Sequence, residues 1–175
     1  MKSKAAPIKF SVFETPLGLT GIASSPKGLC KIKLNISCVD EFEETLRDFQ
    51  DAVPHLDSAS FSQIIRQFDR YFDGKLRKIE CPLDISKGLP FQRLVWSALQ
   101  KAPYGETRSY QWLAAAIGNP KACRAVGTAN GKNNLPIVIP CHRIIRKNGD
   151  IGGFTGGLHL KRYLLDLEKT SNGST

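Results

Sequence analysis

The chain has 175 residues, enough for one domain or two small ones, and for a hydrophobic core that needs no metal or disulfide to stabilise it. No stretch approaches the ~20 apolar residues of a membrane-spanning helix, and the N-terminal MKSKAAPIKF lacks the apolar centre of a secretory signal, so we expect no membrane partner. The net charge of +9 lies in one half, because residues 1–85 carry 12 Lys and Arg against 12 Asp and Glu, whereas residues 86–175 carry 13 against 4. Such a one-sided excess is typical of proteins that bind a phosphate backbone, although a solvated basic surface explains charge alone equally well.

The N-terminal half has the pattern of an α+β domain with an antiparallel β-sheet and helices. Three short β-rich runs are separated by the turn signals TPLG and SPKG, which predicts an antiparallel meander. These runs are residues 8–15, 19–25 and 29–34. Two segments with apolar residues at helical spacing follow, at 39–53 and 60–74. Residues 75–88 have no strong period, so we expect them to connect a domain at 1–85 to a second, mainly helical domain at 86–175.

The C-terminal half opens with three helical patterns. They cover residues 89–105, 109–118 and 119–132. Ser109 is a natural N-cap of the second helix, and Gly118 is a natural stop. Asn119 can cap the third helix, with Pro120 in its first turn. Two short helices joined by so tight a turn predict a helix-turn-helix, although many such pairs bind nothing.

The third helical pattern is almost bare of large side chains. Ala122, Ala125, Gly127 and Ala129 leave it slim, so it can approach a surface closely. Arg124 is the one long cationic side chain in its middle. A slim helix with a central cation suits contact with DNA.

The run IPCHRII at 139–145 carries the most reactive side chains. Apolar residues lead to Cys141 as a buried strand or turn, and Pro140 fixes the backbone before it. His142 and the cations that follow it favour a thiolate, although a single cysteine is more often a buried, inert thiol. The cations are Arg143, Arg146 and Lys147. In an extended segment Cys141 and His142 would point to opposite faces, so adjacency alone does not make a catalytic pair.

A glycine-rich loop and a final helix follow this run. Gly-Gly pairs at 152–153 and 156–157 flank Phe154 and Thr155, so the backbone of the loop can approach a bulky, flat group. Glu168 follows the apolar face of the last helix. A buried carboxylate there would need a partner, and His142 is the candidate.

These motifs, taken in order, resemble the O6-alkylguanine-DNA alkyltransferases. The resemblance rests on SYQWLAAAIGNPKACRAVGTANGKNNLPIV, PCHR and GGFTGG…LLDLE, at the family's spacings, and covers residues 89–168. In residues 1–85 it is limited to a β-rich start and an FDGKL-type turn. The resemblance implies an RNase H-like N-terminal domain and a C-terminal winged helix-turn-helix domain.

The resemblance also implies a methylated-DNA–protein-cysteine S-methyltransferase that acts once. Such a protein repairs DNA by moving the alkyl group of O6-alkylguanine, and less efficiently of O4-alkylthymine, irreversibly onto Cys141. Minor-groove binding and base flipping would come first. His142 would deprotonate Cys141 through a water, which lets neighbouring side chains cooperate without direct contact, and Glu168 would orient His142. Asn133 would brace the active-site turn, and Tyr110 would donate a hydrogen bond to the leaving guanine.

A DNA-binding surface and a substrate pocket follow from the same resemblance. Arg124 would take the place of the extruded base. The further DNA-binding residues would be Ser109, Lys121, Ala125 and Thr128. The pocket residues would be Pro136, Pro140, Ile144, Phe154, Thr155 and Gly156. Several relatives have tyrosine and serine at the positions of Phe154 and Thr155, so we expect the pocket wall to persist and the preferred alkyl size to shift.

The expected partner is double-stranded DNA that contains O6-alkylguanine, with no cofactor and no metal. We expect a monomer, and side-by-side binding of several copies along DNA stays open. The five irregularly spaced cysteines indicate reduced thiols, hence the cytoplasm, or the nucleus in a eukaryote.

Two other classes of function stay open. One is a non-catalytic module that binds or senses alkyl lesions, against which the presence of Cys141 argues. The other is an ordinary DNA-binding regulator or a cysteine hydrolase. For a hydrolase the sequence has no separate oxyanion signal, and the basic half would be unexplained.

Overall fold

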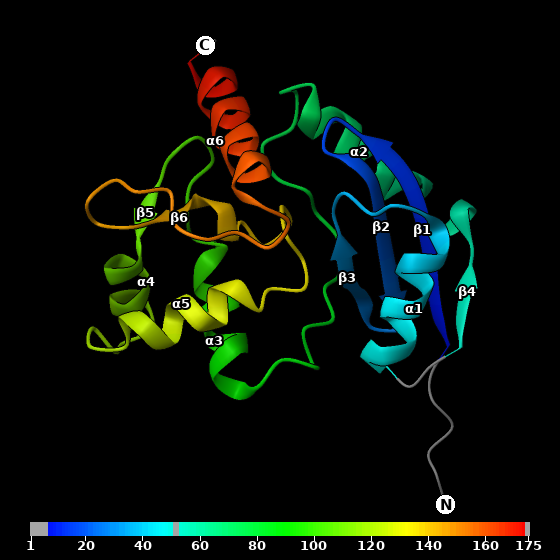
Figure 1. The fold of residues 1–175 in the computed structure, drawn as a ribbon, viewed down its shortest axis with the longest axis horizontal. Coiled ribbons are helices and arrows are strands. Elements are labelled where there is room, and N and C mark those ends of the chain that lie inside the picture. Colours follow the sequence, from blue (N-terminus) through cyan, green and yellow to red (C-terminus); the bar gives the residue numbers. More distant parts are fainter. Residues whose placement is uncertain (1–6, 51–52, 174–175) are drawn as a thin grey trace, which may run out of the picture. The chain divides into compact units, whose positions relative to one another are not determined.

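The computed structural model describes residues 7–50 and 53–173, and the chain divides into two compact units, Met1–Ile85 and Ser86–Thr175. The first unit is a sheet with helices and the second is mainly helical, which confirms the predicted α+β class (Figure 1). Among the residues described, no helix is long and apolar enough to cross a membrane.

The N-terminal unit contains a four-stranded sheet in the order β3-β2-β1-β4. Its strands are β1 (Ile8–Thr15), β2 (Gly18–Ser25), β3 (Gly28–Lys33) and β4 (Pro54–Leu56). The pairs β1–β2 and β2–β3 are antiparallel, as the turn signals predict. The sequence did not predict β4, which pairs parallel to β1 with Ile8 opposite Pro54. Three residues are too few to show a strand period, so the segment around His55 looked like a loop.

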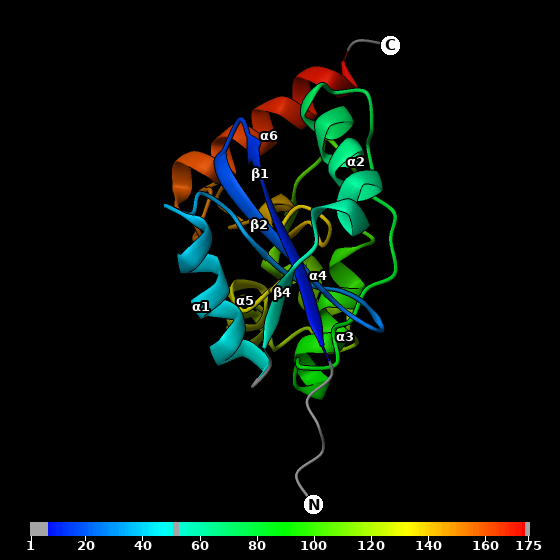
Figure 2. The same cartoon turned by 90° about the vertical axis from the view of Figure 1, so that its right-hand side faces the viewer.

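Helices cover both faces of this sheet (Figure 2). They are α1 (Val39–Gln50), a 3-10 turn at Ser58–Phe61 and α2 (Ser62–Phe72). On one face the ring of Phe10 packs edge-on against Phe42 of α1, with the ring centroids 6.0 Å apart. On the other face Phe13 packs against Phe68 of α2, at 5.4 Å. Residues 10 and 13 face opposite sides because successive side chains of a strand alternate.

The C-terminal unit packs its helices around the segment that contains Cys141. Its elements are α3 (Pro90–Leu99), β5 (Arg108–Ser109), α4 (Tyr110–Ala116), α5 (Cys123–Gly131), a 3-10 turn at Cys141–Arg143, β6 (Ile144–Ile145) and α6 (Leu158–Asn172). The hydroxyl of Ser109 accepts a hydrogen bond from Trp112 N at 3.1 Å, so it caps α4 as predicted. The buried indole of Trp96 on α3 donates to the carbonyl of Ala129 on α5 at 2.9 Å. β5 and β6 form a short parallel pair.

The start of α5 differs from the prediction. Asn119 was expected to cap this helix, but α5 begins at Cys123 with Ala122 as its N-cap. The backbone N–H of Asn119 instead donates to Ala114 O, and its carbonyl accepts from Ala122 N, both at 3.0 Å. Residues 119–122 therefore form the turn between α4 and α5. Asn119 cannot cap α5, because its N–H bonds to the last turn of α4 and its carbonyl bonds within the turn itself.

The close packing of β2 against α1 generates a stability prediction. A Cβ added at Gly21 would lie 2.4–2.6 Å from atoms of the Phe42 ring. We expect Gly21→Ala to lower the free energy of unfolding in urea by about 1–3 kcal/mol, because overpacking forces the ring or the strand to move. Gly131→Ala is the control, since a Cβ there meets nothing within 4 Å, and it should not destabilise. Equal stability of the Gly21 variant and the parent would contradict this packing.

Candidate active site

Cys141 and His142 lie in a 3-10 turn rather than in an extended segment. Their side chains are therefore not forced onto opposite faces, and both are buried, with exposed fractions of 4% and 0%. The turn is held by Asn133, whose side-chain nitrogen donates to Ile139 O at 2.8 Å and whose oxygen accepts from Leu135 N at 3.0 Å. Asn133 thus braces the chain that leads into Cys141.

The braced segment is strained at one residue. Ile137 has φ of 73°, a left-handed conformation that is rare for a β-branched side chain and costs about 1–3 kcal/mol. Its side chain is nevertheless buried. The surrounding packing and the Asn133 hydrogen bonds hold this conformation in place, which presents Cys141 rigidly.

His142 contacts Glu168 directly. Nε2 of His142 lies 2.8 Å from Oε1 of Glu168, and both side chains are buried. The other ring nitrogen, Nδ1, is buried without a hydrogen-bond partner among the residues described. A carboxylate can only accept, so Nε2 carries the proton and Nδ1 of the neutral ring is the basic nitrogen.

Arg143 is the second partner of Glu168. Its Nε and Nη2 donate to the two carboxylate oxygens, each at 2.9 Å. Gly105 N donates to Oε2 at 3.2 Å. Burial alone would raise the pKa of Glu168, but hydrogen bonds and charge from His142 and Arg143 outweigh it and hold the pKa well below its usual range. Glu168 is therefore ionised.

His142 is the basic group of this cluster. Burial lowers its pKa, and Glu168 opposes this effect by favouring the charged ring. Arg143 and Lys161 add a further lowering because both are cations. The ring is thus neutral near physiological pH and available as a base.

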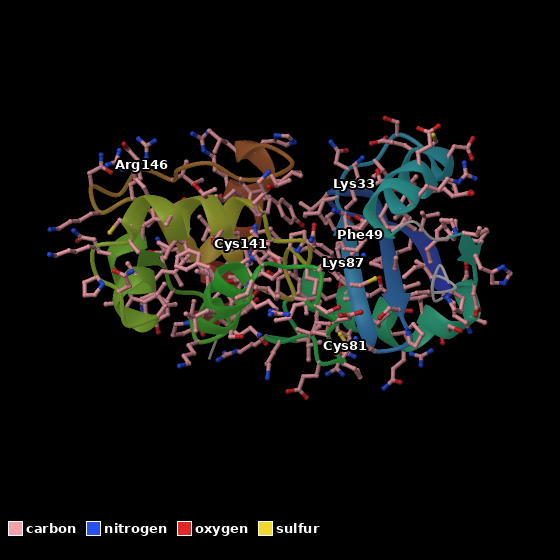
Figure 3. The ribbon with its side chains drawn as sticks, turned by 90° about the horizontal axis from the view of Figure 1, so that it is seen from below. Lys33, Phe49, Cys81, Lys87, Cys141 and Arg146 are labelled. Carbon is pink, nitrogen blue, oxygen red and sulfur yellow. The ribbon has the colours of Figure 1, made fainter. Side chains whose placement is uncertain are left out.

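The electrostatics at Cys141 differ from those predicted. Burial raises the pKa of the thiol, whereas the Asn133 side chain and the Lys161 ammonium lower it. Arg143 is already paired with Glu168, and Arg146 lies at the edge of the unit while Cys141 lies inside it (Figure 3). The cation that acts on the thiol is Lys161 of α6, not the arginine and lysine residues beside it in sequence.

Lys161 is fully buried behind the glycine-rich loop. Its Nζ donates to Ile144 O at 2.6 Å and to Gly153 O at 3.4 Å. Burial lowers its pKa to about 8, and Cys141 partly opposes this effect. The lysine therefore ties the loop to α6 and places positive charge near the thiol.

A pocket of about 520 Å³ opens beside Cys141. Its lining comes from α4, α5, the Cys141 turn, the residue after β6 and the glycine-rich loop: Tyr110, Cys123, Arg124, Gly127, Asn130, Gly131, Cys141, Arg146, Gly152, Gly153, Phe154 and Thr155. Thr155 donates to Gly131 O at 3.1 Å, which joins the loop to the end of α5. Burial and the nearby Cys141 raise the pKa of Tyr110, so it stays a phenol that can donate.

Of the predicted pocket residues, Phe154 and Thr155 line this pocket and four others do not. Pro136, Pro140 and Ile144 are buried, and Gly156 lies just beyond the lining. The predicted DNA-binding side chains Lys121, Arg124, Ala125 and Thr128 are exposed on α5 or on the turn before it. Ser109 is half-buried, with its hydroxyl engaged as the cap of α4.

The sequence did not predict the contacts of three buried polar residues. They are Arg143, Lys161 and Asn130. Asn130 lines the pocket, and its side-chain nitrogen donates to the carbonyl of Cys141 at 3.4 Å. The one available signal was Lys161 at helical spacing among the apolar residues of the last helix, where a lysine is out of place unless it has an internal acceptor.

Two family models match the chain. The DNA binding domain of 6-O-methylguanine DNA methyltransferase matches residues 90–170, and the ribonuclease-like domain of the same family matches residues 8–85.

Relatives match nearly the whole chain. A constitutive methylated-DNA–protein-cysteine methyltransferase of Bacillus subtilis (strain 168) is 39% identical over 163 residues, which is 93% of this chain and 96% of the relative. A methylated-DNA–protein-cysteine methyltransferase of Methanosarcina acetivorans is 40% identical over 164 residues, 91% of this chain and 97% of the relative. The crystal structure of Mycobacterium tuberculosis OGT in complex with DNA matches with a TM-score of 0.80 and 36% identity, over 93% of this chain and 94% of that one.

The position of Lys161 predicts its effect on the thiol. Because Lys161 lowers the pKa of Cys141, Lys161→Met should raise that pKa and leave less thiolate at a given pH. We expect iodoacetamide to modify Cys141 about tenfold more slowly at pH 7.5, which corresponds to roughly one pKa unit. Peptide mass spectrometry would follow the modification. Lys161→Arg keeps the charge and should react nearly as the parent does, and an equal slowing in both variants would indicate lost packing instead.

Proposed function

Because the chain belongs to the 6-O-methylguanine DNA methyltransferase family, we propose that Cys141 is the thiol that accepts the alkyl group from O6-alkylguanine in DNA. The protein is an enzyme that repairs DNA by alkyl transfer to one of its own cysteines. The observation that carries the assignment is the pocket in which Cys141 faces Tyr110 and the glycine-rich loop, with the buried His142–Glu168 pair behind it.

The chemistry is an in-line displacement. A buried thiol with a raised pKa holds its proton near neutrality, so a base is needed, and neutral His142 supplies it through Nδ1. We expect a water to relay this proton. The sulfur then attacks the alkyl carbon, the bond from that carbon to O6 breaks, and the electron pair moves onto the guanine. Tyr110 donates a hydrogen bond to the leaving base, and the loop amides add further donors.

The reaction consumes the protein. The thioether formed at Cys141 has no leaving group that the site can expel, so each chain transfers one alkyl group. O4-alkylthymine presents the same alkyl–oxygen bond and is the less efficient substrate of this proposal. The non-catalytic lesion sensor is disfavoured because the acceptor thiol is present in the pocket.

DNA engagement uses the slim helix α5. Lys121, Arg124, Ala125 and Thr128 form an exposed face without bulky apolar groups, which suits the narrow minor groove. Arg124 also lines the pocket mouth, so it can fill the place of the base that enters the pocket. The chain would act as a monomer, in the cytoplasm or the nucleus, where its DNA substrate lies and where its five free thiols stay reduced.

Removal of the acceptor thiol tests the assignment. Cys141→Ala should abolish alkyl transfer and keep the affinity for duplex DNA, because the thiol is buried beside the DNA-binding face and not on it. Intact mass after incubation with O6-methylguanine DNA should show one added methylene per parent chain, mapped to Cys141, and none in the variant. A methylated Cys141→Ala chain would make another cysteine the acceptor.

Removal of the Arg124 side chain tests base flipping. Arg124→Ala should slow repair of a duplex lesion by about tenfold or more, because extrusion of a base costs a few kcal/mol that the variant no longer offsets. Repair of the free base O6-methylguanine should be almost unchanged. Arg162→Ala, which removes an exposed cation from α6, is the charge control. Equal losses on duplex and free base would contradict a role in flipping.

A further inference from the structure

The carboxylate of Glu168 accepts hydrogen bonds from two parts of the C-terminal unit, the Cys141 turn and the loop at Gly105. Oε1 accepts from His142 Nε2 at 2.8 Å and from Arg143 Nη2 at 2.9 Å. Oε2 accepts from Arg143 Nε at 2.9 Å and from Gly105 N at 3.2 Å. These four donors match the roughly four lone-pair sites of a carboxylate. Glu168 is therefore not reserved for His142, because Arg143 takes half of its acceptor capacity.

The guanidinium of Arg143 is held by further contacts besides Glu168. Nη1 donates to Ala102 O at 2.7 Å, and the guanidinium lies 5.5 Å from the centre of the Tyr104 ring. Its side chain is 8% exposed. A planar fork that makes two bonds to one carboxylate and a third to a backbone carbonyl has a single orientation. The carboxylate plane, and with it the ring of His142, is set by this arginine.

The pairing also sets the charge of the cluster. With His142 neutral, one buried cation and one buried anion cancel. When His142 accepts the thiol proton, the cluster becomes positive by one charge while the sulfur becomes negative. Without the arginine, the carboxylate would face the imidazole alone and would favour the protonated ring before any thiol proton had moved.

We propose that Arg143 is a positioning residue of the alkyl-transfer site, which orients His142 through Glu168 and, by its own positive charge, keeps His142 in the neutral form that serves as the base. The inference rests on the proposed function of Cys141. It adds a fourth member to the Cys141, His142 and Glu168 group. In the step concerned, the S–H bond breaks, the electron pair stays on sulfur, and the proton reaches Nδ1 of His142.

Other groups also face the imidazole and contribute to its charge state. From α6 these are Glu168, which favours the protonated ring, and Lys161, which disfavours it. From the turn itself they are Arg143 and the neighbouring Cys141. Gly105 and Tyr104 complete the surroundings of the carboxylate and the guanidinium. Arg143 differs from Lys161 in that it bonds to the same carboxylate oxygen as His142.

The test is the pH dependence of single-turnover methyl transfer from O6-methylguanine duplex DNA. At low pH the rate falls as His142 becomes protonated, and this falling part of the pH–rate profile is its acid limb. Arg143 lowers the pKa of His142, so Arg143→Gln should raise it and move this acid limb upward by about one pH unit. Arg143→Lys keeps the charge and should leave the limb in place while the rate drops, because the two-pronged contact is lost. An acid limb at the same pH in Arg143→Gln and the parent would overturn the proposal.

A double variant separates this role from general support of the fold. Glu168→Gln removes the group through which Arg143 acts, and it should move the limb to lower pH because the carboxylate favours the charged ring. Adding Arg143→Gln to that variant should then lower the rate by a much smaller factor than it does in the parent, because the contact through which Arg143 orients His142 is already lost, whereas the direct effect of its charge on the limb persists. An equal loss of rate on adding Arg143→Gln in both backgrounds would show that Arg143 does not orient His142 through Glu168.

Two controls keep the outcomes distinct. Arg162→Gln removes an exposed cation of α6 and should leave the limb in place, so a shift there would contradict the local origin of the effect. Thermal unfolding and DNA affinity report whether each variant folds. If Arg143→Gln does not fold, Arg143→Lys is the variant that tests the proposal. A shifted acid limb in Arg143→Lys would contradict it. Loss of all transfer in the parent would instead overturn the function of Cys141.

Discussion

The C-terminal unit depends on one buried carboxylate. An ionised side chain that is 1% exposed would be strongly destabilising unless each lone pair had a donor. Glu168 meets this requirement with donors from the loop at Gly105, from His142 and from Arg143. Those donors belong to two segments, the Cys141 turn and the loop after α3, which lie far apart in the sequence from each other and from Glu168. The electrostatic need of one group therefore joins α6, the Cys141 turn and the loop after α3, and the geometry of the acceptor site follows from it.

In the proposed function, the site keeps its nucleophile as a weakly reactive thiol until a base removes the proton. Burial disfavours the Cys141 thiolate, and Asn133 and Lys161 only partly oppose that effect. A thiol that meets a substrate once gains from this arrangement, because a permanently ionised sulfur would react with any small electrophile that entered the pocket. The burial of Cys141 and the neutrality of His142 thus belong together, since a buried thiol can be used only if an uncharged base stands beside it.

Local signals in the sequence predicted the local structure well. Turn residues and β-rich runs identified the meander, and Ser109 marked the start of α4 because a cap is a local interaction. The predicted start of α5 was wrong because the backbone N–H of Asn119 donates to Ala114 O at the end of the preceding helix. Strand β4 was missed because parallel pairing to β1 has no local signature in three residues. The motif PCHR indicated which residues are the proposed acceptor thiol and base, but periodicity could not show that Arg143 turns inward to Glu168 while Arg146 stays at the surface.

This division of the cations changes the meaning of the net charge. The basic half has an excess of nine positive charges, yet Arg143 and Lys161 are buried and are committed to the carboxylate and to backbone carbonyls. A buried cation contributes little to the field that steers a polyanion, so in the proposed function the charge that attracts DNA comes from exposed side chains such as Lys121 and Arg124. Net charge alone therefore overstates the DNA-binding surface. The proposed function thus gives the arginine and lysine residues of this unit two roles, one in the chemistry of the thiol and one in attraction to the phosphate backbone, and burial decides which role a residue has.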